Sequence, residues 1–156
     1  MADIKTERAL DAYKTLCAAL DDRSWKYEKF NDEMLVRFSV NGDDLPIQYI
    51  IYIEGDRQQV RLLSQLTFDM SEDKRIDGAI AVCHASYGLT DGSFDYDLSN
   101  GQITFRMTQS FEESAININI IQYMIDLTSY VVDDFNDKFF AINKGFLSID
   151  KFLADK

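Results

Sequence analysis

The stretch FDYDLSNGQITFRM, residues 94–107, decides how this sequence folds, because two alternating segments flank an Asn-Gly pair. Asn-Gly is a strong signal for a two-residue hairpin turn, since both central positions require a positive φ angle. A turn centred on that pair places Tyr96 opposite Phe105 and Asp95 opposite Arg106. Side chains alternate between the two faces of a strand, so this register predicts a hairpin with one core face and one solvated face.

The two faces of this hairpin differ completely in character. The core face is expected to carry Phe94, Tyr96, Leu98, Ile103, Phe105 and Met107. The solvated face is expected to carry Ser93, Asp95, Asp97, Thr104, Arg106 and Thr108. On the solvated face Asp95 and Arg106 could recognise a partner or could form a surface ion pair worth roughly 0.2–1 kcal/mol. We favour the surface ion pair.

The charge balance limits the classes of partner. The 156 residues include 27 acidic and 16 basic side chains, a formal net charge of -11, and 46% of the residues are hydrophobic. Such a charge repels nucleic acid and anionic membranes, so neither is expected as a partner. The start MADIKTERAL lacks the apolar core of a signal peptide, and the apolar run YIIYI is too short to span a bilayer. We therefore expect a cytoplasmic protein.

Apolar periodicity predicts an α+β fold in a single domain over residues 1–156. The expected order is a helix, a three-strand antiparallel meander, a second helix, the β-hairpin and a long C-terminal helix. The predicted elements are a helix over 4–20 capped by Asp3 or Thr6, strands over 34–40, 47–54 and 59–68, a helix from about 72 to 87, the hairpin over 92–110, a helix over 114–141, and a final turn or two beyond it.

The second helix holds the residues whose chemistry is most open to interpretation. We expect it to bury one stripe, which consists of Ile76, Ala79, Ile80, Cys83 and Tyr87. Cys17 and Cys83 stand at apolar helical positions without CxxC spacing, so buried free thiols are expected. His84 has no cluster of acidic or thiol groups at ligand spacing and is expected to be a packed or half-exposed helix residue. The sequence therefore predicts no catalytic, cofactor-binding or metal-binding residue, and no cofactor.

The middle strand of the meander is apolar on both faces, which is typical of a central strand. On its second face Ile50 and Tyr52 are joined by Leu35 and Leu63 from the neighbouring strands. These four residues are the candidate partner-binding site. The first helix, through Leu10, Tyr13 and Cys17, a second copy of the chain, or a client peptide could cover them. We place the first helix before the others because it requires no partner.

The order of elements resembles the type III secretion chaperone-like fold and, within it, the YbjN-like bacterial proteins. The local match lies in HASYGLTDGSFDYDLSNGQITFRMTQSF and in the helix that ends FNDKFFAINKG. The residues that match the YbjN-like pattern are Gly92, Phe94, Tyr96, Arg106 and Gly145. The resemblance spans residues 10–145 and implies a small, acidic, cytoplasmic and usually dimeric protein that holds partly unfolded polypeptides or has a regulatory role. It implies no chemistry.

Three functions remain open at this point. The first is a non-enzymatic, chaperone-like module that captures a polypeptide by edge-strand addition or through Leu35, Ile50, Tyr52 and Leu63. The second is a regulatory or structural homodimer that uses the same four residues as its interface. The third is an enzyme without a recognised motif. We expect a polypeptide or a second copy of the chain as the partner, and no enzymatic activity.

Overall fold

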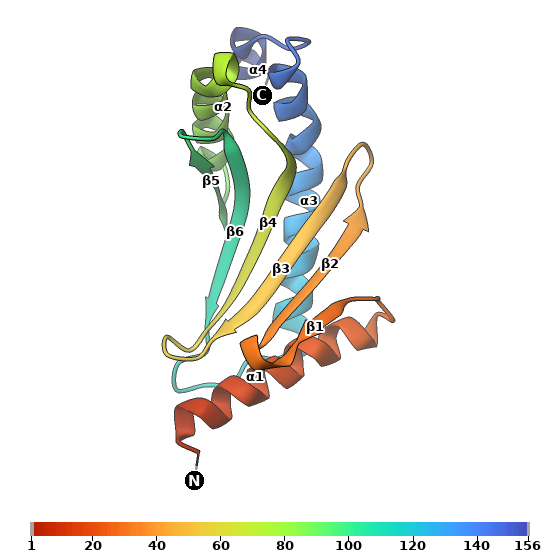
Figure 1. Ribbon diagram of the computed structural model, residues 1–156, viewed down its shortest axis with the longest axis vertical. Coiled ribbons are helices and arrows are strands. Elements are labelled where there is room, and N and C mark those ends of the chain that lie inside the picture. The colour runs from red at the N-terminus through yellow and green to blue at the C-terminus, as the bar shows by residue number, and fades with distance from the viewer. Residues whose placement is uncertain (1, 156) are drawn as a thin grey trace.

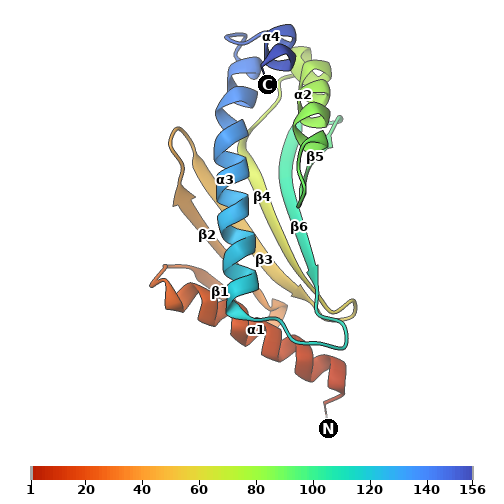
Figure 2. The same ribbon diagram turned by 180° about the vertical axis from the view of Figure 1, so that it is seen from behind.

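The computed structural model describes residues 2–155 and has an α+β fold built on one six-stranded antiparallel sheet, with the strand order β1-β2-β3-β4-β6-β5. The α-helices of the described residues lie on one side of this sheet (Figures 1 and 2). In chain order the elements are α1 (Ile4–Asp22), β1 (Glu28–Phe30), η1 (Asn31–Glu33), β2 (Leu35–Asn41), β3 (Pro46–Glu54), β4 (Gln59–Asp69), η2 (Glu72–Lys74), α2 (Arg75–Tyr87), β5 (Ser93–Asp97), β6 (Gln102–Ser110), α3 (Ile118–Asn143) and α4 (Ile149–Ala154).

The predicted meander is confirmed as β2, β3 and β4, and β3 lies in the interior of the sheet. Along β3 the alternate residues Ile47, Tyr49, Ile51 and Ile53 are buried against the helices. The sheet also has a short edge strand, β1, that the sequence analysis missed. β1 is only three residues long, so it is too short for an alternating pattern to be recognised.

The 94–107 hairpin forms with the predicted faces but with a different register. Tyr96 pairs with Ile103, not with Phe105, and Asp95 pairs with Thr104, not with Arg106. The predicted turn is therefore wrong, and a four-residue loop over 98–101 replaces it. Because the offset is two residues, the side chains within the two strands keep their predicted faces. Leu98 is the exception, since it lies in the loop and is 58% exposed, so its predicted place in the core is wrong.

Local hydrogen bonds at Asp97 explain the longer loop. The Asp97 carboxylate accepts hydrogen bonds from the Ser99 backbone N–H at 2.9 Å and from the Ser99 hydroxyl at 2.6 Å, and the Asp97 carbonyl accepts one from the Gly101 N–H at 2.7 Å. Only Gly101, with a φ of 78°, has a positive φ in this loop. The two positive φ angles of a type I′ turn are therefore not present, and the Asn-Gly signal marks the loop without fixing its length.

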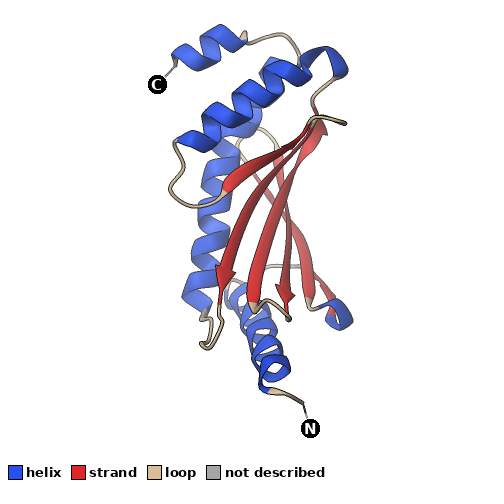
Figure 3. Cartoon of the chain, turned by 90° about the vertical axis from the view of Figure 1, so that its left-hand side faces the viewer, coloured by secondary structure: helices blue, strands red, loops and turns tan. Residues whose placement is uncertain are grey.

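The first helix packs on the same side of the sheet as α3, which overturns the expected cover for Ile50 and Tyr52. Its buried residues are Ala9, Ala12, Tyr13, Leu16, Ala19 and Leu20, whereas Leu10 is exposed. α1 crosses one end of the sheet and contacts α3 and β3 (Figure 3). Its N-cap is Asp3, one of the two predicted caps, whose carboxylate accepts a hydrogen bond from the Thr6 N–H.

Polar contacts attach α1 to the long helix. The Arg23 guanidinium donates two hydrogen bonds to the Asp126 carboxylate, at 2.6 and 2.8 Å. The side-chain amide of Gln122 donates to the Ala19 carbonyl and to Asp22. α3 itself begins at Ile118 and not at 114, because extended Asn117 caps it by accepting a hydrogen bond from the Ile120 N–H.

The second helix buries the face opposite to the predicted one. Its buried residues are Gly78, Ala81, Val82 and Ala85, and small side chains let the helix approach the sheet closely. A Cβ at Gly78 would lie 2.7 Å from the Tyr96 hydroxyl. The predicted stripe faces outward, with Ile76 69% and Tyr87 93% exposed.

Both thiols are less buried than the sequence suggested. Cys83 is exposed and Cys17 is half-buried, so the prediction of two buried thiols is wrong. The exposed His84 ring meets Phe152 of α4 edge-on, with 5.6 Å between the ring centroids.

The two faces of β6 allow a direct stability comparison. Phe105 is 0% exposed and packs edge-on against Phe94, so Phe105→Ala should lower the free energy of unfolding by roughly 3–5 kcal/mol. Arg106 forms an exposed ion pair with Asp95 at 2.7 Å, so Arg106→Ala should cost less than about 1 kcal/mol. Denaturant unfolding measures both, and equal losses would contradict the assignment of the faces.

The attachment of α1 to α3 should depend on pH. Hydrogen bonds from Arg23 lower the pKa of the Asp126 carboxyl below its ordinary value of 3.8 in the folded chain. The pair of Arg23 and Asp126 therefore stabilises the folded chain at pH values above the pKa of Asp126 in the unfolded chain. This stabilisation is lost as the pH falls through the pKa of Asp126 in the folded chain. Asp126→Asn should cost up to about 1 kcal/mol at neutral pH, because the pair is partly exposed. The difference from wild type should vanish in acid, as measured by thermal unfolding at a series of pH values.

Candidate functional site

One side of the sheet is not covered by any α-helix among residues 2–155, and we call this side the open face. In Figure 1 the strands lie in front of α3, and in Figure 2 the same helix lies in front of the strands. The side chains of the open face come from alternate positions of the strands, because those of the remaining positions point toward the helices.

The four candidate residues lie together on the open face, on three adjacent strands. Leu35 of β2 pairs with Tyr52 of β3, and Ile50 of β3 pairs with Leu63 of β4. Ile50 is 37% exposed, and the other three are half-buried. We call these four residues the open-face patch. They are brought together by strand register, which the sequence analysis used to group them.

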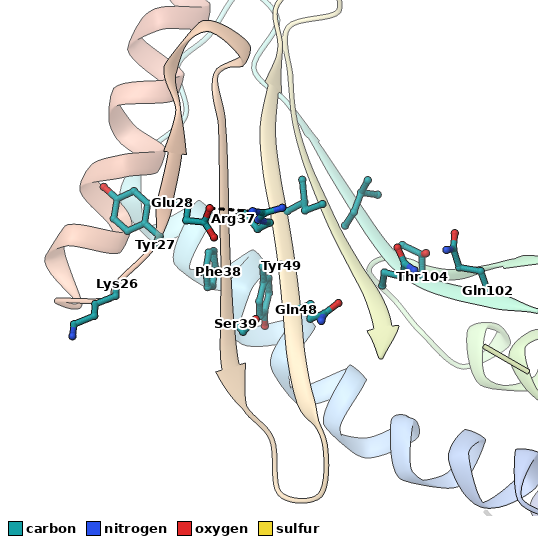
Figure 4. Close-up of a pocket in the computed structure, with 13 residues that line it drawn as sticks. Lys26, Tyr27, Glu28, Arg37, Phe38, Ser39, Gln48, Tyr49, Gln102 and Thr104 are labelled. Atoms are coloured by element: carbon teal, nitrogen blue, oxygen red, sulfur yellow. Dashed lines mark hydrogen bonds and ion pairs between the residues drawn. The ribbon is translucent and has the colours of Figure 1, made fainter. Parts of the chain in front are cut away.

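A shallow hollow of about 810 Å³ runs over part of this face. Figure 4 shows Glu28 and Arg37 at one side of the hollow and Thr104 and Gln102 at the other. Ile50 and Leu63 line the hollow, whereas Leu35 and Tyr52 lie beside it. The remaining lining on this face is largely polar and includes Ser39, Gln48, Gln65, Gln102 and Thr104. Sequence reasoning did not single out these amides, although their alternation with buried residues places them on the open face.

Charged groups at both ends of the open face are paired. Arg37 donates a hydrogen bond to Glu28 at 3.0 Å. At the other end Arg106 donates two hydrogen bonds to Asp95, and these raise the pKa of the Arg106 guanidinium. Asp95 and Arg106 are diagonal neighbours, so the predicted ion pair forms although the two residues are not directly opposite.

Beneath the open face the sheet is held firmly to α3. The Tyr49 hydroxyl donates a hydrogen bond to the Ile125 carbonyl at 3.0 Å and contacts the Ser129 hydroxyl. Burial raises the pKa of the Tyr49 phenol, which stays protonated. The face above it therefore rests on a packed layer and presents apolar, amide and guanidinium groups. Such groups bind a partner through burial, hydrogen bonds and charge.

The described residues lack the features of two other kinds of site. No group of three His, Cys, Asp or Glu side chains within residues 2–155 is placed to hold a metal ion. Over the same residues, no helix combines the length and the apolar character that crossing a membrane requires.

The outer side of α2 is a second exposed apolar surface. Ile76, Ile80, Cys83 and Tyr87 follow one another at spacings of four, three and four, which aligns them along one side of the helix. We call them the α2 outer stripe. A hollow of about 520 Å³ lies beside it, lined by Ala79, Ile80, Cys83, His84, Tyr87 and Leu153.

Comparison with known proteins identifies the fold. No protein-family model and no curated protein matches this sequence. A chain of the HopA1–SchA chaperone–effector complex is similar in structure, with a TM-score of 0.59 at 10% identity over 88% of this chain and 99% of that one. A chain of the ExsC–ExsE complex has a TM-score of 0.57 at 11% identity over 88% of this chain and 96% of that one.

These likenesses define the class of fold to which the chain belongs. The fold is α+β and secretion chaperone-like, with an N-terminal helix, an antiparallel sheet and a long C-terminal helix, as the order of elements predicted. At such low identity the comparison shows the fold alone. The YbjN-like resemblance stays a prediction.

Proposed function

We propose that this chain is a non-enzymatic, cytoplasmic protein-binding module that holds a segment of another polypeptide on the open face. The observation that carries the proposal is the partial exposure of the open-face patch on a side of the sheet that no α-helix of residues 2–155 covers. A solvated face of an antiparallel sheet is normally polar. A cluster of apolar side chains at its centre is typical of an interaction site.

The small area of the open-face patch is suited to reversible binding of a polypeptide. Full burial of an aliphatic or aromatic side chain contributes roughly 1.5–3 kcal/mol, and the patch residues are already partly buried. Each of the four would therefore add about 1 kcal/mol when a partner covers it. Polar side chains around them could bind the backbone of the partner.

A free sheet edge offers a second contact for the same partner. β1 pairs only with residues 35–37 of β2, so no described strand covers the outer edge of residues 38–41. An extended peptide could pair with that edge and continue onto the hollow beside it. At the opposite edge of the sheet, the Phe94 N–H donates to the Ser86 hydroxyl of α2, which blocks strand addition there.

The fold comparison supports this kind of partner. One of the similar structures is a chaperone–effector complex, and the chain shares its fold over most of its length. A secretion chaperone-like chain with an uncovered apolar sheet face is well suited to hold a polypeptide.

The patch can be tested by introducing charge. Ile50→Glu combined with Tyr52→Lys should abolish retention of polypeptides that the wild-type chain captures from its native cytoplasm, because both residues would present charge to an apolar partner. Hydrogen exchange on the captured complexes should show protection on β2, β3 and β4 of the wild type.

The matched control is Ile4→Glu combined with Tyr130→Lys, since both residues are exposed on α-helices and neither belongs to the open face. Both double variants should keep the thermal stability of the wild type. Equal retention of the same polypeptides by the patch variant would remove the open face as the binding site.

The α2 outer stripe favours a second candidate, a regulatory or structural homodimer. A stripe of this spacing can pack against its own copy about a two-fold axis, and each chain then covers the same residues of the other. The sequence analysis placed a homodimer interface on the open-face patch. A dimer that forms through the exposed α2 outer stripe would leave the open face free to bind another polypeptide.

Self-association through α2 has a direct test. Wild type should have the mass of a dimer by light scattering, and Ile80→Asp with Tyr87→Asp should have the mass of a monomer. Labelling of Cys83 should slow as the protein concentration rises, because a dimer would bury this thiol. Ile4→Asp serves as the control. A monomer at every concentration in both proteins would exclude this candidate.

A further inference from the structure

Three arginines stand on the open face, and one of them is chemically different from the others. Arg37 is paired with Glu28 and Arg106 with Asp95. Arg61, between them on β4, forms no ion pair with any carboxylate among residues 2–155. An unpaired guanidinium beside an apolar patch is notable in a chain with a net charge of -11, because acidic residues outnumber basic ones.

The surroundings of Arg61 hold it in place without neutralising it. Its strand neighbours are Tyr52 on β3 and Thr108 on β6, and its guanidinium carbon lies 5.9 Å from the centre of the Tyr52 ring. Glu54 is diagonal to Arg61 in the register, but no ion pair joins them. The Arg61 Nε is buried and has no hydrogen-bond partner. A buried donor left unpaired is costly, so an acceptor from a bound polypeptide would stabilise the Arg61 side chain.

We propose that the open face selects polypeptide segments in which an acidic residue lies close to an aliphatic one. The carboxylate is received by Arg61, and the aliphatic side chain packs on Ile50 and Leu63. This proposal rests on the proposed function and adds the chemistry of the segment that binds. A guanidinium binds a carboxylate through two parallel hydrogen bonds, so Arg61 suits an Asp or Glu side chain.

Strand geometry sets the spacing of the two recognised residues. The pair of Ile50 and Leu63 lies two residues along the strands from the pair of Tyr52 and Arg61. Two residues of a strand span about 7 Å, and an extended peptide has the same repeat. An extended peptide that lies along β3 and β4 can therefore contact both pairs at once. Its aliphatic side chain lies on Ile50 and Leu63, and its carboxylate, two positions away in the peptide, reaches Arg61.

The probe is a random dodecapeptide library displayed on phage and selected on the full-length chain. Peptides selected on the wild type should be enriched in Asp or Glu two positions from Leu, Ile or Val. Selection on Arg61→Glu should replace this enrichment with Lys or Arg. Arg57→Glu is the matched control, because Arg57 is exposed in the turn between β3 and β4 and the change in charge is the same.

A double-mutant cycle then tests the contact itself. For the strongest selected peptide, Arg61→Gln should weaken binding about tenfold, as should replacement of its acidic residue by Gln. The two changes together should cost no more than either one alone, because each removes the same contact. Arg57→Gln should leave the affinity unchanged.

The outcomes separate failure of this inference from failure of the proposed function. Peptides that require Ile50 and Tyr52 but show no acidic enrichment, or that bind Arg61→Gln as tightly as wild type, would overturn the inference alone. If no peptide is selected, or if selected peptides bind the Ile50→Glu, Tyr52→Lys variant equally well, both proposals fail. A wild-type dimer that this variant dissociates would assign the open face to a second copy and overturn both.

Discussion

The structure depends on the packing of one long helix against one face of an antiparallel sheet. α3 has 26 residues, which corresponds to a length of roughly 39 Å, and it runs behind the strands in Figure 1. A helix about 10 Å wide covers only part of a six-stranded sheet, whose strands are spaced about 4.8 Å apart. The remaining buried strand residues need other cover on the same side. α1 supplies it at one end and α2 at the other.

This constraint explains why the other side of the sheet stays open. α1 is the helix that could have covered Ile50 and Tyr52, but its alanines and Leu16 are already buried on the side of α3. Arg23 and Asp126 fasten it there with paired hydrogen bonds. α2 buries Gly78, Ala81, Val82 and Ala85, and its outer stripe lies on the opposite side of this helix, away from the open face. A partner on one surface does not obstruct a partner on the other.

Much of the candidate site was predictable because strand alternation is a local property. The period of two assigned Ile50, Tyr52, Leu35 and Leu63 to one face, and the meander then brought them together. What covers that face depends on helices distant in sequence, and amphipathic periodicity does not say which side of a sheet a helix chooses. The unpaired state of Arg61 was equally inaccessible, because it depends on which carboxylates reach it across neighbouring strands.

The sequence by itself determined the order of the elements apart from β1, the buried positions of the central strands and the faces of the two hairpin strands, because these follow from short-range periodicity. The tertiary structure decided the rest. Hydrogen bonds to Asp97 chose a four-residue loop over the turn that Asn-Gly favours. In α2 close approach to the sheet selected the small side chains around Gly78 for burial and left the large ones in solvent. The short distance between α2 and the sheet, and not hydrophobicity, decided which side chains of α2 are buried. That distance is known only when the elements are packed together.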